Sequence, residues 1–325
     1  NLGSNNTCHA ALFGKFFFRE LYLDRPRFSM LRTLLFGMHL LPMVLLSVVL
    51  AEDAALRLVA LEKYPIDRLT SADLVPYQRQ WLEEGRVSLK GFLLPNVLTQ
   101  MVNEVKDLPS FRRLQVVRSY GIASPLDAPS EGEEHHPTEA LWAQDVFAVA
   151  GDQIANSTLI RQLYESDLMA NFVAQILGLE RLYRYDDRYQ DLNVMFTRDG
   201  GQRAYHYDAS DFIVSVMLQQ PDVGGEFEFA PMLRGPNGEE NYEKVAQLFR
   251  GELPTVVSKA MPGTVTIFNG RRSMHRVRAS YGAQTRILAI LSYDTQASVN
   301  QTRPDLEKNV RLYGERVKLC ANKDV

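Results

Sequence analysis

Residues 204–212 read Ala-Tyr-His-Tyr-Asp-Ala-Ser-Asp-Phe, and this stretch contains two candidate metal ligands that the fold must place side by side. His206 and Asp208 are two positions apart, so both side chains point to the same face if the segment is an extended strand. A second histidine, His275, occurs in a later strand-like segment. One edge of a sheet can therefore offer two imidazoles and one carboxylate to a single metal ion.

The types of these residues point to iron. Two imidazoles and one carboxylate on one face of an iron ion leave three coordination positions open, as expected of a non-haem Fe(II) oxygenase. A His-x-Asp motif alone is common by chance and also fits a hydrogen-bonded surface pair. Arg286 strengthens the metal interpretation, because it stands in the apolar run 285–290, where an unpaired charge is costly. The carboxylate of a dicarboxylic co-substrate would be a suitable partner.

The pattern around these residues predicts an α+β fold. Strand-like runs separated by Gly, Pro and Asp occur at 192–197, 212–218, 226–229, 264–268, 274–277 and 286–293. Helical patterns precede them at 54–63, 73–84, 95–107 and 156–178, with Ser71 as a candidate N-cap and a short strand at 85–89. Helices followed by many short strands predict a double-stranded β-helix, a cupin-like jelly roll, buttressed by N-terminal helices.

The same reading divides the chain into parts. Residues 1–55 form an N-terminal extension, and 56–325 form one domain with a helical part at 56–180, a jelly-roll core at 181–297 and a C-terminal tail at 298–325. A long insertion at 232–254, with a short helix predicted at 241–249, is either a lid or a structural crossover. The Pro-rich stretch 123–137 is predicted as a loop, and its His135-His136 pair as solvated.

Composition limits the classes of partner. The net charge of −3 and the lack of a Lys/Arg-rich run with interleaved aromatic residues exclude a nucleic-acid partner. Cys8 and Cys320, the two cysteines, form neither a disulfide framework nor a zinc site, and they suit a reducing compartment. We therefore expect a cytoplasmic location. The oligomeric state cannot be read from the sequence.

The N-terminal extension leaves an alternative location open. Residues 33–51 carry no formal charge and are numerous enough to span a bilayer. If translation begins at Met30, residues 30–51 also resemble a signal peptide, which would send the chain to the secretory pathway or an organelle. Sequons at Asn5, Asn156 and Asn300 are compatible with secretion. Membrane contact is expected only if 33–51 is a real anchor; an apolar helix packed on the domain, or non-native upstream sequence, is the alternative.

From about Tyr64 to Glu315 the chain resembles the Fe(II)/2-oxoglutarate-dependent dioxygenases, and within them the branch of free-amino-acid halogenases and hydroxylases. The matching segments are 204–212, 224–229, 262–264, 268–277, Arg286 and 293–294, with 64–65, 91–92 and 159–165 upstream. The resemblance implies that His206, Asp208 and His275 hold Fe(II) and that Arg286 pairs with the distal carboxylate of 2-oxoglutarate. Dioxygen takes the last metal position, and the co-substrate leaves as succinate and CO2.

The resemblance also bears on the reaction and the substrate. A small residue replaces the carboxylate ligand in the halogenases, so Asp208 implies hydroxylation, desaturation or cyclisation of a C–H bond instead. The implied substrate is a free amino acid or a similarly small polar metabolite. The candidate contacts, each with an ordinary surface-charge interpretation beside it, are Arg118, Arg203 and Arg272 for a substrate carboxylate and Asp211 for a cationic group.

Two other functions remain open from the sequence. The run Gly225-Glu226-Phe227-Glu228-Phe229 and the possible secretory start also fit a prolyl-hydroxylase-like enzyme that acts on a peptide or protein. A non-catalytic, cupin-like metal-binding module is the third interpretation. The intact ligand set and Arg286 count against it.

Overall fold

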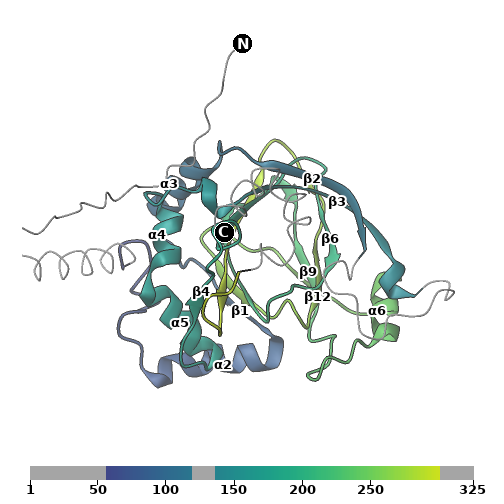
Figure 1. Cartoon of the computed structure of the whole chain (residues 1–325), viewed down its shortest axis with the longest axis horizontal. Helices are drawn as coiled ribbons and strands as arrows, with labels where there is room; N and C mark the ends of the chain where they lie inside the picture. The colour runs from purple at the N-terminus through teal and green to yellow at the C-terminus, as the bar shows by residue number, and fades with distance from the viewer. Residues whose placement is uncertain (1–55, 119–135, 301–325) are drawn as a thin grey trace, which may run out of the picture. The chain divides into compact units, whose positions relative to one another are not determined.

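The structure is a computed structural model that describes residues 56–118 and 136–300 (Figure 1). The apolar segment 33–51, both cysteines and the loop residues up to His135 lie outside these ranges. Among the described residues, no helix has the length and apolar character needed to cross a membrane.

Two antiparallel sheets make up the body of the domain. The seven-stranded sheet has the order β1 (Arg86–Leu89), β11 (Val265–Phe268), β7 (Ile213–Gln219), β14 (Arg286–Leu291), β5 (Leu192–Thr197), β3 (Leu141–Val149) and β2 (Phe111–Arg118). The four-stranded sheet has the order β10 (Val256–Ser258), β9 (Phe227–Ala230), β12 (Met274–Val277) and β6 (Arg203–His206). Two short pairs, β8 (Val223–Gly224) with β13 (Ser280–Tyr281) and β4 (Tyr183–Arg184) with β15 (Tyr293–Asp294), complete the sheet structure.

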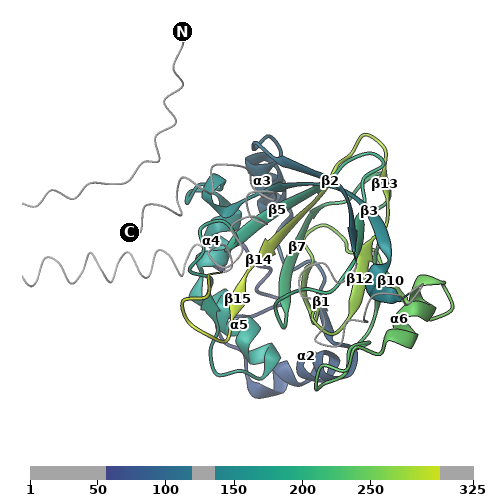
Figure 2. The same ribbon diagram turned by 45° about the vertical axis from the view of Figure 1, so that its right-hand side comes forward.

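The two larger sheets form the jelly roll that the sequence predicts. Figure 2 shows β5, β14 and β7 side by side, with β12 and β10 beyond them. The helices α2 (Ser71–Glu84), α3 (Pro95–Val105), α4 (Leu159–Glu165) and α5 (Asp167–Leu177) lie together on one side of the sheets (Figure 1). The predicted α+β class is therefore confirmed.

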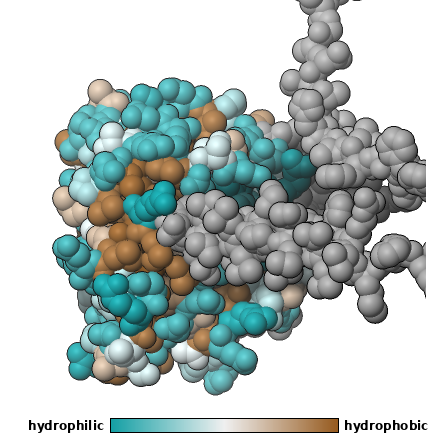
Figure 3. Space-filling model, turned by 90° about the vertical axis from the view of Figure 1, so that its left-hand side faces the viewer, coloured by the Kyte–Doolittle hydropathy of each residue, from teal (hydrophilic) through white to brown (hydrophobic). Residues whose placement is uncertain are grey.

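The main core lies between the seven-stranded sheet and these helices. Alternate positions along each strand point to the same face, and Val194, Val216 and Ala289 of the central strands are completely buried. Phe172 and Ile176 of α5 pack into the same hydrophobic cluster. On the face of the molecule that Figure 3 shows, which includes the helical side, hydrophobic side chains gather in a band bordered by polar ones.

Three details of the helical predictions need correction. The N-cap of α2 is Thr70 and not Ser71, because the Thr70 N–H donates to the Asp73 carboxylate at 2.9 Å. The described part of the helix predicted at 54–63 consists mostly of turns, and Val59 pairs with Leu93 in a β-bridge. The helix predicted at 156–178 is two helices, because Ser166 caps the second one by accepting from the Met169 N–H at 3.3 Å.

The strands β2 and β3 were not predicted. They form a long antiparallel pair, and β3 joins β5, so the part of the chain expected to be helical adds two strands to the larger sheet. Arg112 and Asp145 tie the pair together with two hydrogen bonds of 3.0 and 2.8 Å. Polar residues interrupt the apolar pattern of both strands, which is therefore weaker than the apolar runs of β5 and β14.

The insertion after β9 contains the predicted short helix, α6 (Tyr242–Phe249). Its Val245 and Leu248 are buried in a second hydrophobic cluster that includes Tyr205 and Tyr207. The Phe249 ring lies 5.5 Å from the Tyr205 ring, centroid to centroid. Through these contacts the helix braces the strand that carries His206. The insertion joins β9 to β10, which are neighbours in one sheet, so the predicted crossover between the two sheets is wrong. The lid stays a prediction.

Candidate metal centre

The two histidines are brought together by neighbouring strands. β6 and β12 pair antiparallel, and His206 and His275 are direct partners across the ladder. The register shifts between His275 and Val277, which marks a bulge or irregularity next to the site. The centroids of the two imidazole rings are 4.0 Å apart.

Backbone carbonyls fix the orientation of both rings. Nδ1 of His206 lies 2.8 Å from the Ala204 carbonyl, and Nδ1 of His275 lies 2.9 Å from the Ser273 carbonyl. In both cases the nitrogen must donate to the carbonyl, so the proton sits on Nδ1 and Nε2 keeps its lone pair. A hydrogen bond of this kind is what usually orients a histidine that binds a metal.

The imidazoles are held neutral. Burial lowers the pKa of His206 well below its usual value, and the positive charge of Arg203 adds to this effect. Burial also lowers the pKa of His275. Neutral imidazole is the form that binds a metal ion, so neither ligand has to lose a proton near neutral pH.

The carboxylate of Asp208 faces both Nε2 atoms. Oδ1 lies 3.6 Å from Nε2 of His206, and Oδ2 lies 3.4 Å from Nε2 of His275. The Asp208 N–H donates to the Gly270 carbonyl at 3.0 Å. Gly270 also makes room for the side chain, because a Cβ atom at this position would overlap Oδ2 of Asp208.

These residues fit a metal ion. The three ligand atoms all lie within 4.8 Å of one another, and their types match the two-histidine, one-carboxylate set. Nε of Arg203 donates to Nε2 of His206 at 2.8 Å. A cationic group thus contacts the same lone pair that a metal ion would use.

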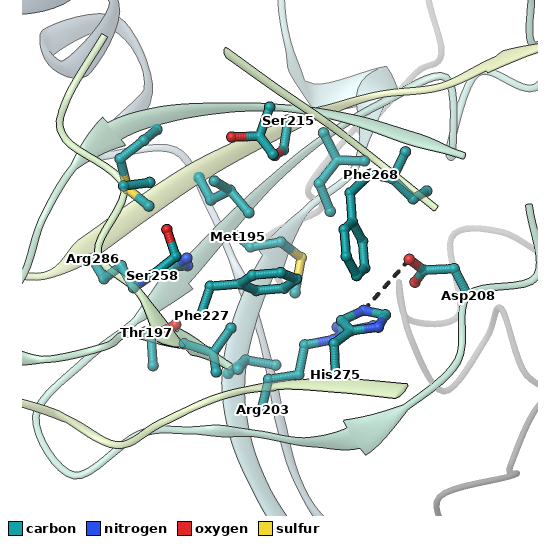
Figure 4. A pocket seen from close by; sticks show the side chains of 18 of the residues that line it. Met195, Thr197, Arg203, Asp208, Ser215, Phe227, Ser258, Phe268, His275 and Arg286 are labelled. Carbon is teal, nitrogen blue, oxygen red and sulfur yellow. Dashed lines mark ion pairs between the residues drawn. The ribbon is translucent and has the colours of Figure 1, made fainter. Parts of the chain in front are cut away.

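The metal ligands stand at one end of a cavity of about 110 Å³ between the two sheets. Figure 4 shows Asp208 and His275 at one end and Arg286 at the other, with Met195 and Phe227 between them. The wall is mostly apolar and comes from strands of both sheets. Such a wall excludes water from the space beside the ligands.

Arg286 ends the cavity opposite the metal ligands. It is buried, with 3% of its surface exposed, and its Nε donates to the Gly225 carbonyl at 3.1 Å. Burial, together with the charge of Arg203, lowers the pKa of Arg286 to about 10, so it remains a cation near neutral pH. Among the described residues it forms no ion pair, and Asp208 is the one acidic residue that lines the cavity. A carboxylate ligand would supply the missing partner.

The predicted substrate residues are spread over the molecule. Arg203 lines the cavity. Arg272 does not; its Nε donates to the Arg234 carbonyl at 3.1 Å. Asp211 is exposed and lies 3.2 Å from Arg271. Arg118 ends β2 as the partner of Leu141. The role of each in substrate binding stays a prediction.

The roles of two further residues near the metal ligands were not recognised in the sequence. Gly270 lies in the matching segment 268–277, but nothing local revealed its contact with Asp208. Arg86 of β1 also lines the cavity, and its Nη2 donates to Ser258 Oγ at 2.7 Å. Its position inside the alternating strand 86–89 was the one available signal.

Comparison with known proteins gives similarity in structure. No protein-family model and no curated protein matches the sequence. SnoN, a non-haem α-ketoglutarate-dependent epimerase from nogalamycin biosynthesis, has 18% identity over 69% of this chain and 83% of its own, with a TM-score of 0.48. A 2OG-Fe(II) oxygenase family oxidoreductase from Burkholderia pseudomallei has 17% identity over 72% and 96% of the two chains, with a TM-score of 0.47. HygX from Streptomyces hygroscopicus, with nickel, 2-oxoglutarate and hygromycin B bound, has 12% identity over 71% and 89%, with a TM-score of 0.48.

Proposed function

We propose that the protein is an Fe(II)- and 2-oxoglutarate-dependent oxygenase that hydroxylates, desaturates or cyclises a small metabolite at a C–H bond. One arrangement carries this proposal. Two neutral imidazoles and a carboxylate converge at one end of an apolar cavity, and the unpaired guanidinium of Arg286 stands at the other. A molecule that chelates a metal at one end and carries a carboxylate at the other fits both ends.

Each residue has a role in this proposal. His206, Asp208 and His275 hold the iron, and Arg286 holds the distal carboxylate of 2-oxoglutarate by charge-assisted hydrogen bonds. Iron, 2-oxoglutarate and dioxygen, when bound, supply the oxidant that removes hydrogen from the substrate. The Ala204 and Ser273 carbonyls keep the two rings aimed at one point. Phe227 and Phe268, whose ring centroids lie 5.4 and 5.0 Å from that of His275, keep water away.

The proposed substrate is a free amino acid. Arg203 supports this choice because it lines the cavity beside His206. Iron at Nε2 of His206 would take the place of that contact, and the positive charge of Arg203 would then lie next to the reacting position. A substrate carboxylate placed there would hold the adjacent carbon atoms near the metal.

The direct test is an anaerobic titration with Fe(II) and then with 2-oxoglutarate, followed in the visible absorption spectrum. Admission of oxygen with a panel of free amino acids, read by mass spectrometry, then identifies the product. We expect a spectral change that saturates with 2-oxoglutarate, and succinate formation that depends on one amino acid. Failure to bind 2-oxoglutarate in the presence of iron would refute the proposal. Binding followed by turnover of a prolyl peptide alone would refute the amino-acid substrate and keep the reaction class.

A further inference from the structure

A second hollow, of about 480 Å³, opens on the molecular surface where the two sheets end. β1 is the last strand of the seven-stranded sheet and β10 the last strand of the four-stranded sheet. The two end strands approach each other at Arg86 and Ser258, which are joined by a hydrogen bond of 2.7 Å. Arg86, Ser258 and Ala260 line both this hollow and the metal cavity, so the two spaces adjoin.

The lining of this hollow is basic. It contains Arg86, Lys90 and Lys259, and among the described residues that line it none is acidic. The alternation of β1 explains the placement of the first two cations. Val87 and Leu89 are fully buried under the helices, so Arg86, Ser88 and then Lys90 face the other way.

The lysines are accessible and Arg86 is fixed in place. Lys90 and Lys259 are exposed and form no ion pair in the described part of the chain. Arg86 is half-buried, and its guanidinium lies 5.6 Å from the centroid of the Phe229 ring. A rigid guanidinium and two mobile ammonium groups together suit a ligand with several negative oxygens.

Two buried polar atoms at the hollow have no partner of their own. Nε of Arg86 and Oγ1 of Thr264 are both buried without a hydrogen bond among the described residues. Thr264 is 1% exposed and lines the hollow. Unsatisfied buried donors are costly, so a small rotation that turned either group towards the oxyanion of a ligand would offset this cost.

We infer that this hollow, formed by Arg86, Lys90, Lys259 and Thr264, is a binding site for a small organic polyacid. Arg286, the proposed co-substrate residue, does not line this hollow, although Lys259 lines a small neighbouring pocket with it. Polyacid binding in the hollow does not depend on the proposed function. Clustered oxyanions are the shared chemistry, whether they are carried as carboxylates or as phosphate groups. Binding there would place the ligand beside the metal cavity, with which the hollow shares Arg86, Ser258 and Ala260.

The test measures binding of citrate and of inorganic pyrophosphate to the full metal-free chain by calorimetry at low ionic strength. We expect binding that weakens as salt is added, because exposed charges are screened. The variants Lys90→Gln and Lys259→Gln are each expected to weaken it roughly fivefold, and the double variant more. Lys106→Gln, which removes an exposed charge at the end of α3, is the matched control and should bind as the unaltered chain does.

Two further variants make the result decisive. Arg286→Gln should keep the binding, because Arg286 does not line this hollow. Loss of binding in Arg286→Gln with no change in the lysine variants would move the polyacid to the other position and overturn the inference.

Arg86→Gln should weaken binding further; if that variant does not fold, the lysine variants decide alone. No binding of either probe, or equal binding by the double lysine variant, also overturns the inference. Tighter binding of pyrophosphate than of citrate would identify the oxyanions as phosphate, and the reverse as carboxylate.

Discussion

Gly270 lies so close to Asp208 that any side chain at position 270 would occupy the space of the carboxylate. The two residues are also joined by the hydrogen bond from the Asp208 N–H to the Gly270 carbonyl. Asp208 follows β6 and Gly270 precedes β12, so this contact sets where the carboxylate stands relative to both histidines.

The first prediction concerns this contact. Gly270→Ala should displace the carboxylate and weaken metal binding by about tenfold to a hundredfold, the range seen when a group that orients a metal ligand is lost. Overpacking should lower the free energy of unfolding by about 1–3 kcal/mol. Metal affinity and chemical denaturation measure the two effects. The double variant Gly270→Ala/Asp208→Gly should be as stable as Asp208→Gly, since the three atoms nearest to the new Cβ all belong to the Asp208 side chain; additive losses would contradict the steric explanation.

His206→Ala, Asp208→Ala and His275→Ala are each expected to abolish succinate formation and metal binding. Each of the three residues supplies one ligand atom to the cluster, and none of them can be replaced by a neighbour among the described residues. Metal content after desalting and circular dichroism provide the measurements. Retention of full activity by a folded variant would remove that residue from the site.

Arg286→Met separates binding from stability. The KM for 2-oxoglutarate should rise more than about a hundredfold, because losing one partner of a buried ion pair costs about 3 kcal/mol or more. Without co-substrate, the free energy of unfolding of the same variant should be higher by on the order of 1 kcal/mol, because the substitution removes a buried cation that has no anionic partner among the described residues. Chemical denaturation measures this change. An unchanged KM would place the co-substrate elsewhere.

The environment of Glu228 predicts that the free energy of unfolding falls in acid. Burial alone would raise the pKa of Glu228, but hydrogen bonds from Arg278, Arg276 and Thr255 lower it to about 2. A lowered carboxyl pKa contributes stability that is fully present above the ordinary value near 4.5 and is lost as pH falls towards 2. Glu228→Gln should remove this pH dependence, which we expect to be on the order of 2 kcal/mol because the two arginines are partly exposed. Denaturation curves at about pH 5 and about pH 3 for both proteins provide the comparison, since the first lies above this range and the second lies within it.

The carboxylate of Asp208 also predicts the type of product. Because an anionic ligand already faces the metal position, we expect no chlorinated product even at high chloride concentration. Mass spectrometry of the reaction detects the halogen by its isotope pattern. Asp208→Gly, tested with chloride and with bromide, shows whether removing the carboxylate admits a halide. Chlorination by the unaltered chain would contradict the role given to this residue.

The sequence predicted those elements whose signals are local. The strands at 192–197 and 274–277 were predicted with their observed bounds, because apolar and β-branched residues there are flanked by turn residues. The division at Ser166 was missed, since a serine inside an apolar helical run signals a cap only once the chain is seen to turn there. β2 and β3 were missed because their pairing spans a long intervening segment.

The residues around the metal centre were likewise predicted only where their signal is local in the sequence. The ligand types and their spacing predict that His206, Asp208 and His275 meet, and their ligand atoms lie within 4.8 Å of one another. Arg86 could not be found in that way, because it meets Ser258 from a position 172 residues away. Which residues line a cavity depends on which strand ends come together. The local sequence pattern does not show which strands pair.

The place of β6 at the end of its sheet has a practical consequence. In the four-stranded sheet β6 pairs with β12 alone, and with an irregular register. An iron ion held by one histidine from each strand would fasten this outer strand to its neighbour, and a ligand at a hundred times its Kd adds about 2.7 kcal/mol of stability. Without iron, β6 would keep its packing against α6 and the bridge from Gln202 to Asp145 of β3. Iron would therefore act as a further attachment of this strand, and its loss would loosen the strand where His206 faces His275.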